Sequence, residues 1–260
     1  MAKVKPTDEF SRYDKATQPV KQRIIALSAG EPGSRKTSFW LEAPGPIIVF
    51  SMDRGLDGVI QRYQETKDIY VKEYPWFPIG EDVVERASEV RAEFIEDYEH
   101  AMTIARTVVL DKGDDFWNLY RMAEGLTGGD AQKDYAVVNA KMRHLLNLAK
   151  ASDINLGVIA GLKDKWGPVV NRRTGQVGQG PTGERVPAGF KEMEGLVHMV
   201  LIHTGLSPAT WQVQVGKVRG PGSMDLAEQT FPFDLGNGET LTFAKFGMMV
   251  FPDSDESSWI

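Results

Sequence analysis

The chain has no cysteine and only four histidines among its 260 residues. The absence of cysteine excludes disulfide bridges, zinc sites built on cysteine and thiol catalysis, and it is typical of the reducing interior of a cell. The four histidines are scattered and do not form a metal-binding motif. The sequence therefore predicts a cytoplasmic protein whose chemistry depends on other side chains.

Long apolar runs and an excess of positive charge are also missing. No stretch approaches the roughly 18 apolar residues that a membrane span needs. The opening residues, MAKVKPTDEF, carry charge but not the apolar segment of a signal peptide. The formal net charge is −6, so any contact with nucleic acid must be confined to a local basic patch.

Composition and pattern predict one main domain with two short extensions. Residues 1–22 mix charges of both signs with few apolar anchors and predict an N-terminal arm. Residues 23–250 contain the apolar runs of a single domain, whose size suffices for one core. Residues 251–260, which end in DSDESSWI, predict an acidic C-terminal tail, and a plain disordered end is the simplest interpretation.

Short apolar runs alternate with helical patterns along this domain. Apolar positions three or four apart predict helices over about 81–105 and from Tyr135 to Leu148, and a shorter helix begins at KTSFWLEA. The alternation predicts an α/β fold with a mostly parallel sheet, covered by helices on both faces. The predicted strands are RIIALS (23–28), IIVFSMD (47–53), RTVVLD (106–111), NLGVIAGL (155–162), LVHMVLIH (196–203) and WQVQVGKVR (211–219).

Two later segments differ from this alternation. Beyond about residue 205, WQVQVGKVR and ETLTFAKFGMMV (239–250) predict antiparallel strands joined by glycine-rich turns. Residues 166–189 are polar and rich in glycine and proline, which predicts a long loop that is either functional or disordered.

The segment GEPGSRKT, residues 30–37, follows a predicted strand and precedes a helix. In such phosphate-binding loops backbone N–H groups surround phosphate oxygens, a lysine reaches the outer phosphates and a hydroxyl holds Mg²⁺. Arg35 stands where glycine is usual, and we expect its N–H to remain in the loop if its φ is negative. The alternative is a chance glycine turn. The predicted nucleotide-binding residues are Gly30, Glu31, Pro32, Gly33, Ser34, Arg35, Lys36, Thr37 and Ser38.

Two aspartates end predicted strands. Asp111 closes RTVVLD, where with Thr37 it would hold Mg²⁺, although a turn or helix-capping role is equally compatible with the pattern. Asp53 closes IIVFSMD, where a carboxylate would activate the attacking water, unless it is a turn residue ahead of Gly55. Together with the loop, these residues predict a site for ATP and Mg²⁺.

This order of parts, over roughly residues 20–220, resembles the RecA-like P-loop ATPase core, in particular the phage-encoded proteins of DNA recombination and single-strand annealing. The resemblance implies that Lys36 and Asp53 are catalytic, and that the protein forms a ring or a filament. In VGKVRG, Lys217 and Arg219 resemble the pair that such cores insert into a neighbouring subunit's site. The alternative is a basic edge strand that resists aggregation.

The resemblance also implies that loops after the third and fourth strands hold single-stranded DNA. Trp166 and Phe190 would stack on bases, and Phe116, Trp117 and Arg121 either join that surface or lie in the core. A solvated loop without ligand is the alternative. The basic residues of this segment, opposed by Asp164 and Glu184, are Lys163, Lys165, Arg172, Arg173, Arg185 and Lys191.

The resemblance leaves several functions open. It favours an ATP-dependent protein that promotes annealing or strand pairing in phage recombination. A helicase-like motor or loader and a non-hydrolysing assembly module are the alternatives. Lys163 would either sense the terminal phosphate or contact DNA. The acidic tail is similar to those by which single-strand-binding proteins recruit partners, which suggests a replication protein as a further partner.

Overall fold

The computed structural model describes residues 21–74, 82–126, 135–170, 173, 175–207, 210–233 and 241–260. The predicted arm therefore lies almost wholly outside the described residues. The first half contains β1 (Ile25–Gly30), α1 (Lys36–Leu41), β2 (Ile47–Ser51), β3 (Ile69–Glu73), α2 (Val83–Ile104), β4 (Thr107–Asp111), α3 (Gly113–Ala123) and α4 (Tyr135–Ala151). The second half contains β5 (Asn155–Ala160), β6 (Leu162–Val170), β7 (Val177–Pro187), α5 (Met193–Leu196), β8 (Met199–Ser207), β9 (Thr210–Lys217), α6 (Ser223–Leu226), β10 (Thr230–Phe233) and α7 (Phe243–Val250).

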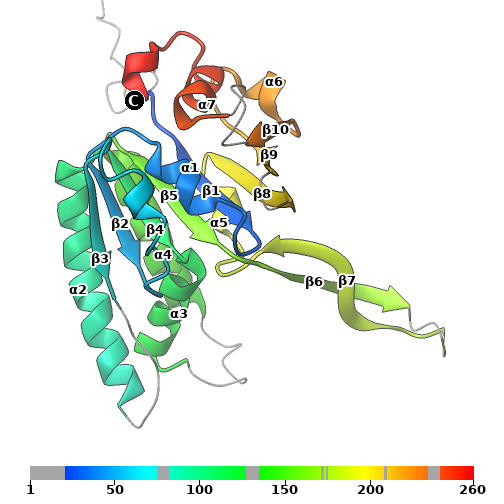
Figure 1. Ribbon diagram of the computed structural model, residues 1–260. Helices are drawn as coiled ribbons and strands as arrows, with labels where there is room; N and C mark the ends of the chain where they lie inside the picture. The colour runs from blue at the N-terminus through cyan, green and yellow to red at the C-terminus, as the bar shows by residue number, and fades with distance from the viewer. Residues whose placement is uncertain are drawn as a thin grey trace, which may run out of the picture.

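An eight-stranded sheet in the order β10-β9-β8-β1-β5-β4-β2-β3 forms the centre of the molecule (Figure 1). The six strands from β8 to β3 are parallel, and β9 and β10 continue the sheet in antiparallel fashion. The predicted mixed α/β class with a mostly parallel sheet is confirmed. The short edge strand β3 was not predicted, since its side chains are mostly exposed and lack a buried run.

Helices cover both faces of this sheet, which explains why its central strands β1, β4 and β5 are mostly apolar and buried along their whole length. Ile25 and Leu27 of β1 face a cluster that includes α2, α3 and α4, whereas Ile24 and Ala26 belong to the cluster under α1 and α7. Each cluster is rich in aromatic rings, such as Phe94 and Phe116 with centroids 4.5 Å apart on the first face. Strand β1 is thus held from both sides.

The segment ETLTFAKFGMMV does not form the predicted strand, and its described part is helix α7. The Thr242 hydroxyl accepts a hydrogen bond from the Lys245 N–H at 3.1 Å and caps the helix. Its buried residues, Phe243, Phe246 and Val250, are three and four positions apart. This helical spacing, rather than the alternation expected of a strand, decides the structure.

Most of the described part of residues 166–189 forms a β-hairpin rather than the predicted loop. Strands β6 and β7 pair antiparallel from Leu162↔Pro187 to Val170↔Val177 and make a separate two-stranded sheet. The hairpin projects from the body of the molecule (Figure 1). Glycine, proline and polar residues hide its strand pattern, because neither face of a projecting ribbon needs an apolar core.

The predicted disordered C-terminal end is also wrong. Trp259 is 1% exposed, and its ring stacks on Phe251 at 5.5 Å. A Cβ on Gly247 would lie 2.2 Å from the Trp259 ring, so α7 approaches the indole through its glycine. Only Ile260 of the terminal apolar pair is exposed, at 63%. Elsewhere, none of the helices that the structure describes has the length and apolarity to span a bilayer.

Candidate functional site

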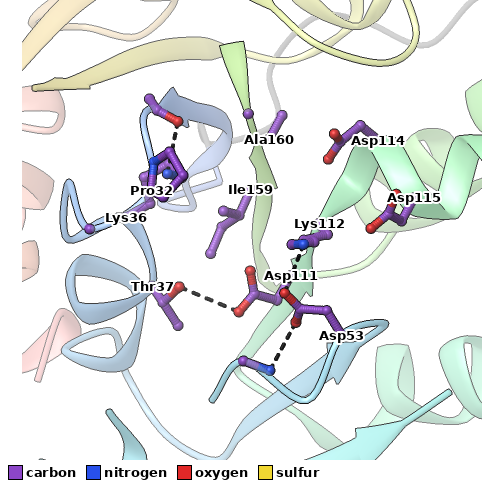
Figure 2. Close-up of a pocket in the computed structure, with 14 residues that line it drawn as sticks. Pro32, Lys36, Thr37, Asp53, Asp111, Lys112, Asp114, Asp115, Ile159 and Ala160 are labelled. Atoms are coloured by element: carbon purple, nitrogen blue, oxygen red, sulfur yellow. Dashed lines mark hydrogen bonds and ion pairs between the residues drawn. The ribbon is translucent and has the colours of Figure 1, made fainter. Parts of the chain in front are cut away.

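A cleft of about 460 Å³ opens where β1, β4, β2 and β5 end (Figure 2). Parallel strands bring their carboxyl ends to the same end of the sheet. Strand β1 lies between β8 on one side and β5, β4 and β2 on the other, so the connections from β1 to β2 and to β8 run in opposite directions across the sheet. Such a switch point is where open α/β sheets bind ligands. The cleft is lined by Gly30, Pro32, Gly33, Lys36, Thr37, Asp53, Gly55, Asp111, Lys112, Asp114, Asp115, Ile159, Ala160 and Gly161.

The loop between β1 and α1 is wrapped around the ammonium group of Lys36. The Lys36 Nζ donates to the carbonyl oxygens of Gly30 and Glu31 at 2.9 and 2.8 Å, and it lies 3.3 Å from the Ser34 Oγ. Burial lowers the pKa of Lys36, and nearby Asp111 and Glu31 oppose that shift. A Cβ on Gly30 would meet the His203 carbonyl oxygen at 2.3 Å, so glycine is required here.

Arg35 adopts the left-handed conformation, with φ 65° and ψ 22°, so the condition under which its N–H was expected to remain in the loop, a negative φ, is not met. Its guanidinium lies 4.3 Å from the centroid of the Trp211 ring on β9, within cation–π range. The Trp211 Nε1 also donates to the Gly33 carbonyl at 3.0 Å. Trp211 thus binds the loop at two points. It gave no sequence signal, because the contact joins residues far apart in the chain.

Thr37 and Asp111, the predicted ligands of Mg²⁺, lie side by side in the cleft. The Thr37 Oγ1 donates to Asp111 Oδ2 at 3.4 Å. Burial, with a contribution from Asp53, raises the pKa of Asp111 to about 6. Hydroxyl and carboxylate oxygens are suitable ligands for Mg²⁺, which takes only one or two from the protein when phosphates and water supply the rest. The described residues contain no cluster of three or more metal-binding side chains.

Asp53 lies beside Asp111, just beyond the end of β2. Its Oδ1 accepts the Gly55 N–H at 2.9 Å, and its Oδ2 forms an ion pair with Lys112 Nζ at 2.9 Å (Figure 2). Burial alone would raise the pKa of Asp53, but the bonds from Lys112, Gly55 and Ser51 together lower it. The two strand-end carboxylates therefore have opposite pKa shifts, as in sites where they have different roles.

Lys112, Asp114 and Asp115 also line the cleft and were not predicted as site residues. Asp114 Oδ1 is buried without a hydrogen-bond partner, and burial raises the pKa of this carboxyl group. The charged run DKGDD directly after a strand was the available signal.

The predicted DNA-binding residues are dispersed over the hairpin and its base. Lys165 pairs with Glu184 at 2.7 Å, and Arg185 contacts Glu31 at 3.0 Å and Asp164 at 3.5 Å. Hence the hairpin's acidic residues offset part of its positive charge. The Lys163 Nζ donates to the Gly189 carbonyl. Arg173 is described near the hairpin's tip, Lys191 is exposed before α5, and Arg172 lies outside the described residues.

The aromatic residues of the predicted DNA surface have different fates. Trp166 is 68% exposed on β6, whereas Phe190 is buried, so base stacking by Phe190 is excluded. Phe116 lies in the core and Trp117 packs against it. The Arg121 guanidinium lies 4.9 Å from the Trp117 ring. The core alternative thus holds for this part of α3.

Lys217 and Arg219 lie away from the cleft of their own chain. Strand β9 runs antiparallel to β8, and Lys217 pairs with Val200 near the amino end of β8, whereas Trp211 lies at the other end of β9 beside the loop. The Lys217 Nζ donates to the backbone carbonyls of Glu194 and Val197. The predicted insertion into a site therefore requires a second subunit and stays a prediction.

A scan against protein-family models gave no match, and a search of curated proteins found no relative of this chain.

Proposed function

We propose that the protein is an oligomeric, RecA-like ATPase that acts with Mg²⁺ on single-stranded DNA and promotes annealing or strand pairing in the host cytoplasm during phage recombination. One observation carries the ATPase assignment. The loop lysine Lys36, the Thr37–Asp111 pair and Asp53 come from three different strand ends and line one cleft. The parallel sheet brings these strand ends together, and the side chains found there, an ammonium group, a hydroxyl and two carboxylates, are the types that phosphoryl transfer requires.

The arrangement gives each residue a chemical role. The loop N–H groups and Lys36 bind the phosphates, while Thr37 and Asp111 hold Mg²⁺, which when bound neutralises phosphate charge. Asp53 accepts a proton from water as the water oxygen bonds to the terminal phosphorus. The bond from that phosphorus to its bridging oxygen breaks, and ADP and phosphate leave. Arg219 of a neighbour would stabilise the charge that develops.

The hairpin supports the choice of single-stranded DNA as the ligand. It projects from the same edge as the cleft, directly after β5, and presents the exposed indole of Trp166 among basic side chains. Exposed aromatic rings beside lysine and arginine bind bases without sequence preference. We expect Trp166→Ala to weaken binding of single-stranded DNA by about 1–3 kcal/mol. Tyr70→Ala, which removes an aromatic ring 60% exposed on edge strand β3, should leave it unchanged.

The ATPase proposal is tested by phosphate release with and without single-stranded DNA, over a range of protein concentrations. Wild type, Lys36→Ala, Arg219→Ala and the surface control Lys72→Ala are compared. We expect turnover that rises with DNA and concentration, is lost in the first two variants and persists in the control. Directional unwinding that requires hydrolysis would instead indicate a helicase-like motor.

Two observations favour a non-hydrolysing assembly module as the second candidate. Arg35 is strained in the loop, and Asp53 is held by an ion pair. This candidate predicts assembly that depends on nucleotide, with no phosphate released even when DNA is present. The concentration series distinguishes it, because assembly measured by light scattering would then rise without turnover.

A further inference from the structure

Lys112 lines the cleft but has no part in the proposed mechanism. It links β4 to α3 in the left-handed conformation, at φ 64° and ψ 61°. Left-handed backbone costs a residue with a side chain about 1–2 kcal/mol, and such strain persists where function requires it. Here this residue lines the cleft, and its ammonium group lies 2.9 Å from Asp53 Oδ2.

The charges around Lys112 make its contact with Asp53 exchangeable. Lys36 and Lys112 are the two lysines among the described residues that line the cleft. Lys36 is enclosed by its loop, whereas the Lys112 side chain is 47% exposed, so solvent borders much of it. A terminal phosphate would bring more negative charge than the single carboxylate of Asp53, and it would reach the cleft from the loop opposite.

Asp53 would keep its place if Lys112 left it. The Gly55 N–H fixes Oδ1 at 2.9 Å, and the Ser51 hydroxyl lies 3.4 Å from the same oxygen. Departure of Lys112 would thus uncover Oδ2 alone. That oxygen would then be available to accept a proton from water.

We propose that Lys112 is a phosphate-sensing residue, which holds Asp53 in the absence of nucleotide and moves to the terminal phosphate of a bound nucleoside triphosphate, freeing Asp53 for water. The inference rests on the proposed function and adds a selection for triphosphate over diphosphate. A diphosphate has no group in the terminal position, so with ADP bound Lys112 stays on Asp53 and the site stays inactive.

The test compares the affinities for a non-hydrolysable ATP analogue and for ADP, by titration calorimetry with Mg²⁺. Lys112→Met removes the charge, and Lys112→Gly removes the side chain while suiting the left-handed backbone. Both should lose about tenfold or more in affinity for the triphosphate analogue, as expected for a lost charged hydrogen bond, and keep their affinity for ADP. Lys112→Arg should retain most of the preference.

Lys72→Met is the matched control, because it also removes a lysine from an exposed ion pair, with Glu93 at 2.7 Å, outside the cleft. Equal losses for both nucleotides in the two Lys112 variants, or no loss in either, would overturn the inference and leave the ATPase proposal standing. If the wild type binds neither nucleotide, both proposals are wrong. Thermal unfolding of each variant verifies that it is folded.

Discussion

At the scale of single residues, Arg35 explains how a loop that lacks its usual glycine is built. The left-handed backbone conformation is unfavourable for a residue with a side chain, but the guanidinium gains a contact with the buried Trp211 ring. A cation–π contact of this kind contributes about 0.5–2 kcal/mol, which is comparable to the strain. The arginine is therefore compatible with a formed loop.

Substitutions at Arg35 separate these two effects. Arg35→Ala keeps the strain and loses the Trp211 contact, whereas Arg35→Gly loses both. We expect the alanine variant to have a free energy of unfolding lower than that of the glycine variant by about 1–2 kcal/mol. Urea denaturation gives both values, with Arg62→Ala as a control for loss of a nearby positive charge. Equal stabilities would mean that the left-handed backbone is not strained.

Glu42 provides a pH-dependent test. Burial raises its pKa to about 7, despite the Phe243 N–H and the nearby charge of Lys67. The folded state thus binds this proton more tightly than the unfolded state, and stability falls as pH rises from about 4.5 to 7. Glu42→Gln removes this effect. At pH 8 we expect its free energy of unfolding, measured by urea denaturation, to exceed that of the wild type by about 1–3 kcal/mol, with a smaller gap at pH 5. A gap independent of pH would contradict the assignment.

At the scale of elements, the sequence was most informative where burial is complete. The strands β1, β2, β4 and β5 were predicted because continuous apolar runs are what a doubly covered sheet demands. The hairpin and α7 were not. The hairpin is stabilised by backbone pairing between exposed strands, and α7 is apolar enough to match either pattern until its neighbours are known.

The C-terminal residues 251–260 contribute to the hydrophobic cluster on the face of the sheet that α1 and α7 cover. Trp259 packs against Phe243 and Gly247 of α7 and against Phe251, which follows the helix. We expect Trp259→Ala to lower the free energy of unfolding by about 3–5 kcal/mol, as for other buried aromatic residues. Ile260→Ala, at an exposed position, should change it little. A mobile tail would instead make both substitutions neutral in thermal unfolding.

A polar contact joins the hairpin to the loop between β1 and α1. Arg185 of β7 pairs with Glu31 of the loop, and both side chains are about half exposed. Exposed ion pairs add about 0–1 kcal/mol to the free energy of unfolding. The Arg185–Glu31 pair therefore orients the two segments more than it stabilises the fold. The hairpin's orientation is thereby related to that of the loop.

At the scale of the whole molecule, the cleft and the predicted Lys217–Arg219 pair lie at opposite ends of the parallel strands. The cleft lies at the carboxyl ends of the parallel strands, and Lys217 lies near their amino ends. Spacing along the sequence located Lys36, Thr37, Asp53 and Asp111, since each lies at or shortly after the end of a predicted strand. Spacing did not reveal Lys112 or Trp211, because their roles depend on a turn conformation and on a contact across the sheet.

Separation of the two parts predicts that subunits complement each other. Lys36→Ala inactivates a subunit's own cleft. Arg219→Ala leaves that cleft intact but removes the arginine side chain that the subunit would donate to its neighbour's cleft. We expect a mixture of the two inactive variants to recover part of the DNA-stimulated phosphate release. Mixing Lys36→Ala with a Lys36→Ala, Arg219→Ala double variant is the control, which should stay inactive. Equal inactivity of both mixtures would mean that Arg219 does not act in a neighbouring cleft.

The central place of β1 also governs how the protein folds. Its pairing partners, in β5 and β8, come from far along the chain, so the cleft depends on contacts with a high entropic cost of closure. Pairing of β6 with β7 is local and closes quickly. A refolding chain should therefore form its hairpin before the loop between β1 and α1, and a ligand of the cleft cannot guide the earliest steps.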